Sequence, residues 1–208
     1  MSKREIIGKN KRKLDIFEQM VVLALYIWFI LRLCPGTFAE VNLYLLLLLL
    51  SESMVVVFVL IRRPTENISI SFRDWFIAFS GTFLPLLISK GGEPFMPGVG
   101  LCLLLWGLFI HLGAKLSLFR SFGIVPADRG VKVKGLYALV RHPMYAGYFC
   151  THLGFLLAAP SLWNFTVYIC AWGLLLSRIF AEERLLLRSP DYQEYKNRVS
   201  YRIIPGIF

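Results

Sequence analysis

A series of long apolar segments constrains this chain more than any other feature of its sequence. They cover Ile16–Cys34, Val41–Ile61, Trp75–Ser89, Gly98–Phe119, Met144–Ala159 and Leu162–Phe180. A helix needs about 20 apolar residues to cross the hydrocarbon layer of a membrane, and most of these segments approach that length. We therefore predict an all-α integral membrane protein with about six transmembrane helices.

Composition supports a membrane location and argues against a nucleic-acid partner. The chain has 208 residues, of which 57% are apolar, and its mean hydropathy is +0.62. Its formal net charge is +10. The basic residues flank the apolar segments instead of forming one face, so they indicate membrane orientation rather than nucleic-acid binding.

The distribution of the 23 lysines and arginines predicts which side of the membrane each connection occupies. With a cytoplasmic N-terminus and six spans, 21 of them fall on the cytoplasmic side, and only Arg32 and Lys90 lie elsewhere. Cytoplasmic loops are enriched in lysine and arginine. We therefore expect both termini to be cytoplasmic.

The region after the sixth segment predicts a small cytoplasmic helical cap. Ser189-Pro190-Asp191 has the pattern of a helix start, with an N-cap serine followed by proline. The helix that it opens would carry Tyr192 and Tyr195, and the chain then ends in a turn at residues 201–206. We expect a single membrane domain, with four helices in residues 1–128 and a functional core in residues 129–208.

Several common classes of site have no signature in this sequence. The four cysteines are isolated, and no spacing predicts a disulfide framework or a metal site. There is no glycine-rich dinucleotide or phosphate loop, no HExxH and no Gly-x-Ser-x-Gly. We therefore expect no metal.

Two charged motifs stand at the ends of the last hydrophobic hairpin. The first is Gly135-Leu-Tyr-Ala-Leu-Val-Arg-His-Pro-Met-Tyr145, and the second is Arg178-Ile-Phe-Ala-Glu-Glu183. Pro143 suits the first turn of a helix, which places Arg141 and His142 at its positive end. Arg178 and Glu182 are four residues apart and share a helix face. Both motifs should lie at the same membrane face.

These motifs resemble the isoprenylcysteine carboxyl methyltransferase family. The similarity covers residues 129–208 and combines Gly-x-Tyr-x-x-x-Arg-His-Pro-x-Tyr-x-Gly, Arg-x-x-x-Glu-Glu and Tyr-x-x-Tyr. Related membrane phospholipid N-methyltransferases share much of this pattern, and membrane sterol reductases have a similar C-terminal fold. The compact chain and its Ile-Pro-Gly ending are more similar to bacterial members.

The resemblance implies S-adenosylmethionine as cofactor, bound in a pocket at the cytoplasmic face. It assigns Arg178 to the substrate carboxylate and to catalysis, together with Glu182. The residues that it places at the cofactor are Val131, Lys132, Tyr137, His142, Pro143, Met144, Tyr145, Glu182 and Glu183. A sulfonium is a strong methyl donor, so the protein has mainly to align the acceptor and exclude water.

The sequence is compatible with more than one kind of methyl acceptor. A carboxylate is already ionised at pH 7 and needs a guanidinium to hold it, whereas an amine needs a proton acceptor. We prefer carboxyl O-methylation of an isoprenylcysteine-like lipid, with phospholipid N-methylation as the alternative. A non-catalytic or reductase-like relative of the same fold is a third possibility. The expected location is a bacterial inner membrane, or the endoplasmic reticulum in a eukaryote.

Overall fold

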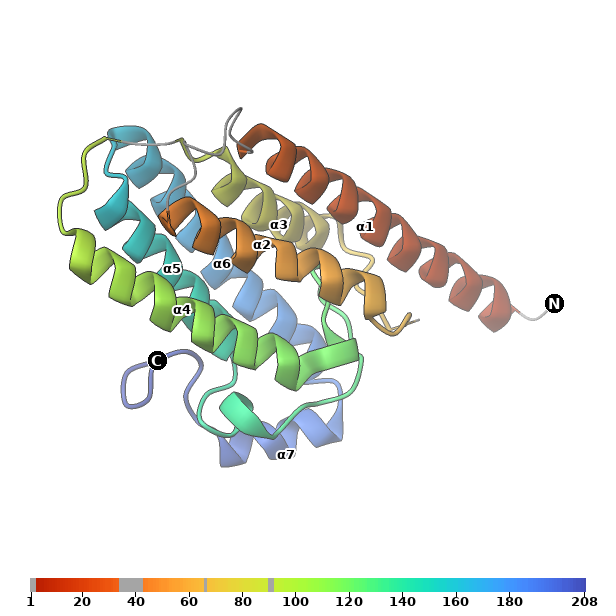
Figure 1. Cartoon of the computed structure of the whole chain (residues 1–208). Helices are drawn as coiled ribbons and strands as arrows, with labels where there is room; N and C mark the ends of the chain where they lie inside the picture. Colours follow the sequence, from red (N-terminus) through yellow and green to blue (C-terminus); the bar gives the residue numbers. More distant parts are fainter. Residues whose placement is uncertain (1–2, 34–42, 66, 90–91) are drawn as a thin grey trace.

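The structure is a computed structural model that describes residues 3–33, 43–65, 67–89 and 92–208. Its regular elements in these ranges are helices, and the β-type pairing found there is an isolated bridge between Ile68 and Ala127. Six helices form a bundle, and a short seventh helix lies across one end (Figure 1). The predicted all-α fold class is confirmed.

The six bundle helices fall on the six apolar segments of the sequence. They are α1 (Lys3–Leu33), α2 (Leu43–Ile61), α3 (Phe72–Phe83), α4 (Pro97–Leu118), α5 (Pro143–Ala158) and α6 (Leu162–Leu186). The seventh helix is α7 (Pro190–Arg198), and the 3-10 turns are η2 (Leu84–Leu87), η3 (Phe119–Ser121) and η4 (Gly135–Ala138). Helix α7 begins at the predicted Ser189-Pro190 start, with Ser189 as its N-cap.

Three helices of the described chain are long and apolar enough to cross a membrane. These stretches are Arg12–Leu31, Pro97–Ser121 and Leu162–Leu186. Helices α3 and α5 have 12 and 16 residues, less than a straight crossing needs. The count of six spans and the orientation of the termini therefore stay predictions. Lys90 and the side chain of Arg32 lie outside the described residues.

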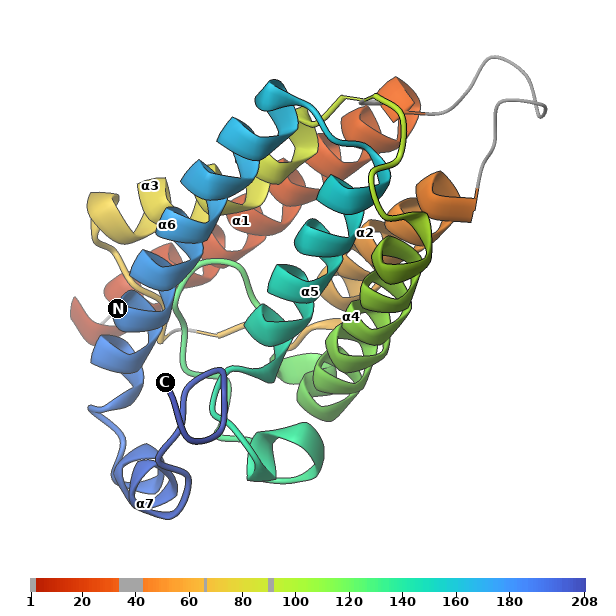
Figure 2. The same cartoon turned by 90° about the vertical axis from the view of Figure 1, so that its left-hand side faces the viewer.

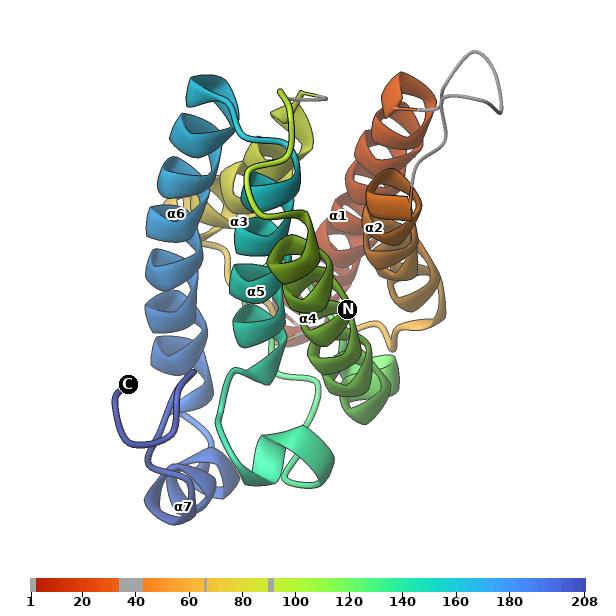
Figure 3. The same ribbon diagram turned by 60° about the vertical axis from the view of Figure 1, so that its left-hand side comes forward.

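Helices α4 and α5 pack against each other with their backbones in close contact. A Cβ added at Gly107 would lie 2.6 Å from the Thr151 nitrogen, and one added at Gly147 would lie 2.8 Å from the His111 nitrogen. Only glycine allows such an approach, as is common between membrane helices. Helix α5 lies between α4 and α6 (Figure 3). Its contacts with α6 include aromatic side chains such as Phe149 and Trp172.

Both charged motifs lie at one end of the bundle. The C-terminal ends of α2, α4 and α6 reach this end, together with the start of α5, and α7 and the chain terminus lie beside them (Figures 1 and 2). The terminal segment folds back there, since the backbone N–H groups of Arg141 and His142 donate to Tyr201 and Arg202 at 2.9 and 2.7 Å. This arrangement brings residues 60 positions apart in the sequence together at the start of α5.

Candidate active site

The α5–α6 hairpin brings the two motifs into direct contact. Pro143 is the first residue of α5 and His142 is its N-cap, as the sequence predicts. Helix α6 continues to Leu186, so Arg178 and Glu182 lie on one helix face and form an ion pair at 3.1 Å. The Tyr145 hydroxyl donates a hydrogen bond to Glu182 across the hairpin. Glu182 is thus shared by both motifs.

The carboxylate of Glu182 has one occupied oxygen and one available oxygen. Its Oε1 accepts from both Arg178 Nε and the Tyr145 hydroxyl. Its Oε2 lies 3.8 Å from His142 Nδ1 and forms no hydrogen bond with the described residues. The side chain is 20% exposed. An anionic oxygen of this kind is a suitable partner for a cationic group of a ligand.

Glu182 lines a cavity of about 110 Å³. Its wall contains most of the residues that the resemblance assigns to the cofactor. These are Val131, Lys132, Tyr137, His142, Met144, Tyr145 and Glu182. The rest of the wall comes largely from the loop between η3 and η4 and from Leu118, Leu186, Tyr192 and Tyr195. We call it the surface cavity.

The donors, acceptors and apolar walls of the surface cavity fit S-adenosylmethionine. Glu182 Oε2 suits the cationic amino group, while Arg141 and His142, which also line the cavity, are hydrogen-bonding groups for other polar atoms of the cofactor. Apolar side chains such as Leu118 and Leu186 offer a surface for a purine ring. The chemistry of the wall therefore matches the implied cofactor.

Arg178 lines a second, smaller cavity inside the bundle. Its guanidinium is buried, with Nη2 donating to the Gly123 carbonyl at 3.1 Å and Nη1 donating to Thr82 Oγ1 at 3.4 Å. It also lies 5.6 Å from the centre of the Tyr145 ring. This interior cavity of about 20 Å³ is lined by Tyr26, Gly81, Thr82, Pro85, Tyr148, His152, Leu175 and Arg178.

Glu183 does not line the surface cavity but occupies a buried ion-pair cluster behind it. Its Oε1 accepts from Arg141 Nε at 2.8 Å and lies 3.3 Å from His142 Nε2. Its Oε2 accepts from Arg202 Nε at 3.0 Å. We call Arg141, His142, Glu183 and Arg202 the C-terminal charge cluster. The cluster joins the terminal segment to the start of α5 and to the end of α6. Pro143 is the first residue of α5 and does not line the cavity.

Helix α7 forms one side of the surface cavity with two buried tyrosines, Tyr192 and Tyr195. The Tyr195 hydroxyl donates to the Tyr137 carbonyl at 2.7 Å, which holds α7 against η4. Burial raises the pKa of Tyr195 to about 12, and burial together with Glu182 raises the pKa of Tyr137 well above its usual value. Both phenols are therefore neutral at physiological pH and act as hydrogen-bonding groups.

Two sets of residues near the site had no signal in the sequence. His152, Tyr148 and Thr82 line the interior cavity but come from apolar segments, where single polar residues usually serve packing. Asp15 and Glu18 of α1 contact the loop beside the surface cavity from more than 100 residues away. The described residues contain no group of His, Cys, Asp or Glu suited to a metal ion.

Comparison with known proteins agrees with the resemblance. Residues 99–188 match the model of the isoprenylcysteine carboxyl methyltransferase (ICMT) family. The matched region begins in α4 and includes both charged motifs and the whole α5–α6 hairpin. A search of curated proteins found no match. Over this region the chain is therefore similar to the isoprenylcysteine carboxyl methyltransferase family, which is a family of membrane methyltransferases.

Proposed function

We propose that the protein is an S-adenosylmethionine-dependent enzyme that methylates the carboxylate of an isoprenylcysteine-like lipid. The proposal rests on one observation: the ion pair between Arg178 and Glu182 links two cavities. Glu182 lines the surface cavity, Arg178 lines the interior cavity, and their side chains are hydrogen-bonded at 3.1 Å. Methyl transfer between a water-soluble donor and a lipid acceptor needs such a meeting point.

The residues of the surface cavity would bind and orient the cofactor. When bound, S-adenosylmethionine supplies a methyl group on a sulfonium, which needs no further activation by the protein. Glu182 Oε2 would accept from the amino group, and His142 and Tyr145 would form the adjoining wall. Tyr192 and Tyr195 of α7 would exclude water from this side.

The interior cavity presents hydrogen-bond donors suited to an oxygen acceptor. Arg178 offers a guanidinium, whose fork can hold both oxygens of a carboxylate. Trp172 Nε1 donates to His152 Nδ1 at 3.2 Å, so the proton of a neutral His152 imidazole resides on Nε2. A histidine in this tautomer donates a hydrogen bond and cannot take a proton at Nε2. This favours a carboxylate over an amine, which would require a base.

The reaction then needs no proton transfer. A carboxylate oxygen would accept the methyl group that the bound cofactor supplies, and the product would be a methyl ester. Because a carboxylate has no proton to lose, none of the residues of either cavity would have to act as a base. Arg178 would hold the acceptor oxygen in line with the methyl group, because it lies one helical turn before Glu182 on α6.

The proposal is tested by methyl transfer from labelled S-adenosylmethionine to two acceptors. Purified protein in lipid nanodiscs should methylate N-acetyl-S-farnesylcysteine, and the product should be a base-labile ester. The same compound with its carboxylate already esterified is the matched control and should not react. Labelling of phosphatidylethanolamine instead would establish N-methylation, and no labelling of either lipid would contradict methyl transfer to these classes.

We further propose that the surface cavity faces the cytoplasm, with six spans and both termini on that side. The distribution of lysine and arginine supports this orientation. The membrane would be a bacterial inner membrane, or the endoplasmic reticulum in a eukaryote. Reporter fusions after Lys90 and after Phe208 should report opposite sides. The same side for both fusions would contradict the topology.

A further inference from the structure

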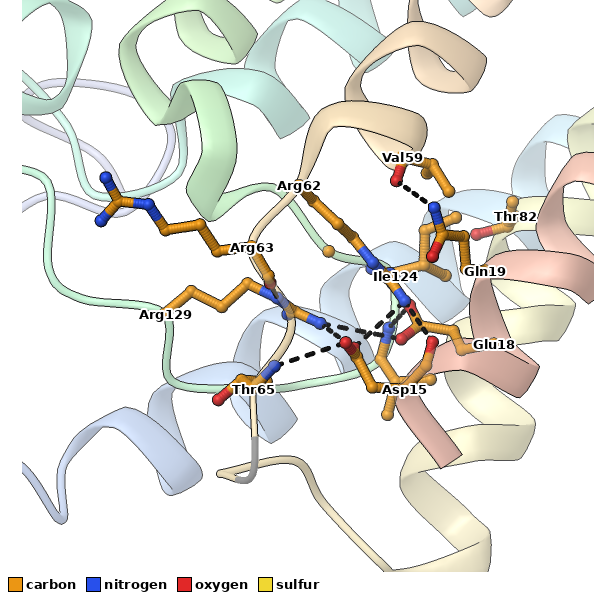
Figure 4. Close-up of polar contacts among 12 residues, drawn as sticks. Asp15, Glu18, Gln19, Val59, Arg62, Arg63, Thr65, Thr82, Ile124 and Arg129 are labelled. Carbon is orange, nitrogen blue, oxygen red and sulfur yellow. Dashed lines mark hydrogen bonds and ion pairs between the residues drawn. The ribbon is translucent and has the colours of Figure 1, made fainter. Parts of the chain in front are cut away.

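A second group of buried charges lies beside the surface cavity, outside both sequence motifs. It consists of Asp15 and Glu18 of α1, Arg62 just after α2, and Arg129 of the loop between η3 and η4 (Figure 4). We call these four residues the N-terminal charge cluster. Their side chains are at most 3% exposed.

The cluster is neutral as a whole and tightly connected. Arg62 lies 3.1 Å from Asp15 Oδ1 and 3.0 Å from Glu18 Oε1, while Arg129 forms an ion pair with Asp15 and lies 3.9 Å from Glu18 Oε2. Burying two ion pairs costs desolvation energy that apolar side chains of similar size would avoid. Helix packing alone therefore does not explain why charges occupy this position.

Glu18 makes a second kind of contact, with the backbone of the cavity wall. Its Oε1 accepts from the N–H group of Ile124 at 2.9 Å (Figure 4). It also accepts from the N–H group of Val125 at 2.9 Å. The loop that contains them, residues 122–132, supplies a large part of the surface cavity wall. A buried carboxylate on two successive backbone donors fixes the course of this loop relative to α1.

Arg129 connects the N-terminal charge cluster to Arg178, the residue proposed to bind the substrate, through Gly123. Its guanidinium lies so close to Gly123 that a Cβ added there would collide with Nη1. The carbonyl of the same Gly123 accepts from Arg178 Nη2 at 3.1 Å. A single residue thus separates the N-terminal charge cluster from the arginine that lines the interior cavity.

We infer that Glu18 and Arg129 are positioning residues, which hold loop 122–132 in the shape that binds the cofactor and that places Arg178. Asp15 and Arg62 balance their charge. The inference rests on the proposed function, because it concerns the same two cavities. It assigns the first helix, which lies outside the family match, a direct part in forming the site.

The test separates positioning from stability with three variants. Glu18→Met removes the acceptor for Ile124 and Val125 and leaves a buried positive charge. The double variant Glu18→Met with Arg62→Met removes that excess charge but does not restore the acceptor. Asn164→Leu is the control: Asn164 Oδ1 also accepts a backbone N–H, from Ser89 at 2.9 Å, but at the far end of α6 from the cavity.

Three quantities are measured for each variant: the unfolding temperature, the affinity for S-adenosylhomocysteine by calorimetry, and hydrogen exchange of peptides that cover residues 122–132. Glu18→Met should lower the unfolding temperature, weaken binding at least tenfold and speed exchange in this loop. The double variant should regain most of the unfolding temperature while binding stays at least tenfold weaker and exchange stays fast. Asn164→Leu should lower the unfolding temperature without changing binding.

The results distinguish the possible roles of the cluster. If affinity returns together with the unfolding temperature in the double variant, Glu18 is only structural and the inference is wrong. Unchanged exchange of loop 122–132 in Glu18→Met would contradict it as well. If the wild type binds no S-adenosylhomocysteine, the proposed function fails, and exchange of the loop alone then decides whether Glu18 holds it.

Discussion

Two buried charge clusters flank the surface cavity, and they differ in how they are built. The C-terminal charge cluster centres on one carboxylate, that of Glu183, which lies within ion-pair distance of Arg141, Arg202 and His142. The N-terminal charge cluster pairs two carboxylates with two arginines, and one of its carboxylates also holds backbone N–H groups. Each contributes residues to the cavity wall, Arg141 and His142 from the first and Arg129 from the second.

The two clusters also connect different parts of the protein. The C-terminal cluster joins the start of α5, the end of α6 and the terminal segment. Its loss should therefore lower the stability of the folded protein. The N-terminal cluster joins α1 to one loop of the wall, so its loss should deform the cavity. The following changes test this division, beginning with the largest expected effect.

Glu183→Gln should cause the largest loss of stability. The change leaves the buried Arg141 without its carboxylate, and breaking a buried ion pair costs about 3–5 kcal/mol. Chemical unfolding in detergent measures the free energy of unfolding. Glu194→Gln is the matched control, because its pair with Arg198 is exposed and should contribute less than about 1 kcal/mol. Equal effects of the two changes would contradict the central role of Glu183.

Glu182→Gln should act on binding, although Glu182 is the neighbour of Glu183 in sequence. The change removes the charge of the oxygen that faces the surface cavity, which should cost about 1.5–3 kcal/mol, or roughly ten- to a hundredfold in affinity for S-adenosylhomocysteine. Calorimetry of the folded variant measures it. Unchanged affinity would leave Glu182 as a helix ion pair with Arg178.

Arg178→Lys should distinguish the roles of the two cavities, because it should lower activity without lowering cofactor affinity. Lysine keeps the charge but lacks the planar fork, so kcat/KM for a prenylcysteine acceptor should fall roughly tenfold or more. Affinity for S-adenosylhomocysteine should change less than about threefold, because Glu182 retains its open oxygen. Loss of cofactor affinity in parallel with activity would contradict the assignment of Arg178 to the acceptor.

Tyr195→Phe should have the smallest effect. It removes one neutral hydrogen bond to the Tyr137 carbonyl, worth about 0.5–1.5 kcal/mol of unfolding free energy. Because the pKa of Tyr195 is raised to about 12, the hydroxyl stays protonated, and the loss should be the same at pH 6 and pH 9. Tyr201→Phe, at an exposed tyrosine, is the control and should be neutral.

The helices of this fold were predictable because each apolar segment signals its own helix. The starts of α5 and α7 were also predictable, since Pro143 and Pro190 each occupy the first position of a helix. The short apolar segments Trp75–Ser89 and Met144–Ala159 also predicted short helices, and α3 and α5 have 12 and 16 residues. The sequence could not show the glycine contacts between α4 and α5, because these depend on the register of two helices.

The C-terminal part of the site was predictable because its residues are spaced by helical turns. Arg178 and Glu182 share a face, and their pairing with the Arg-His-Pro motif follows from one hairpin. The N-terminal charge cluster was missed because Arg62 and Arg129 were interpreted as charges that orient the chain in the membrane. Their partner Asp15 lies 47 and 114 residues away from them, and no local pattern links positions that distant.

We propose that the surface cavity binds S-adenosylmethionine. This is tested by calorimetric titration of the purified wild-type protein with S-adenosylhomocysteine, with NADPH titrated under the same conditions. We expect saturable binding of one S-adenosylhomocysteine per chain and no binding of NADPH. Binding of NADPH with no response to S-adenosylhomocysteine, in protein shown to be folded, would contradict the claim and indicate a reductase-like relative.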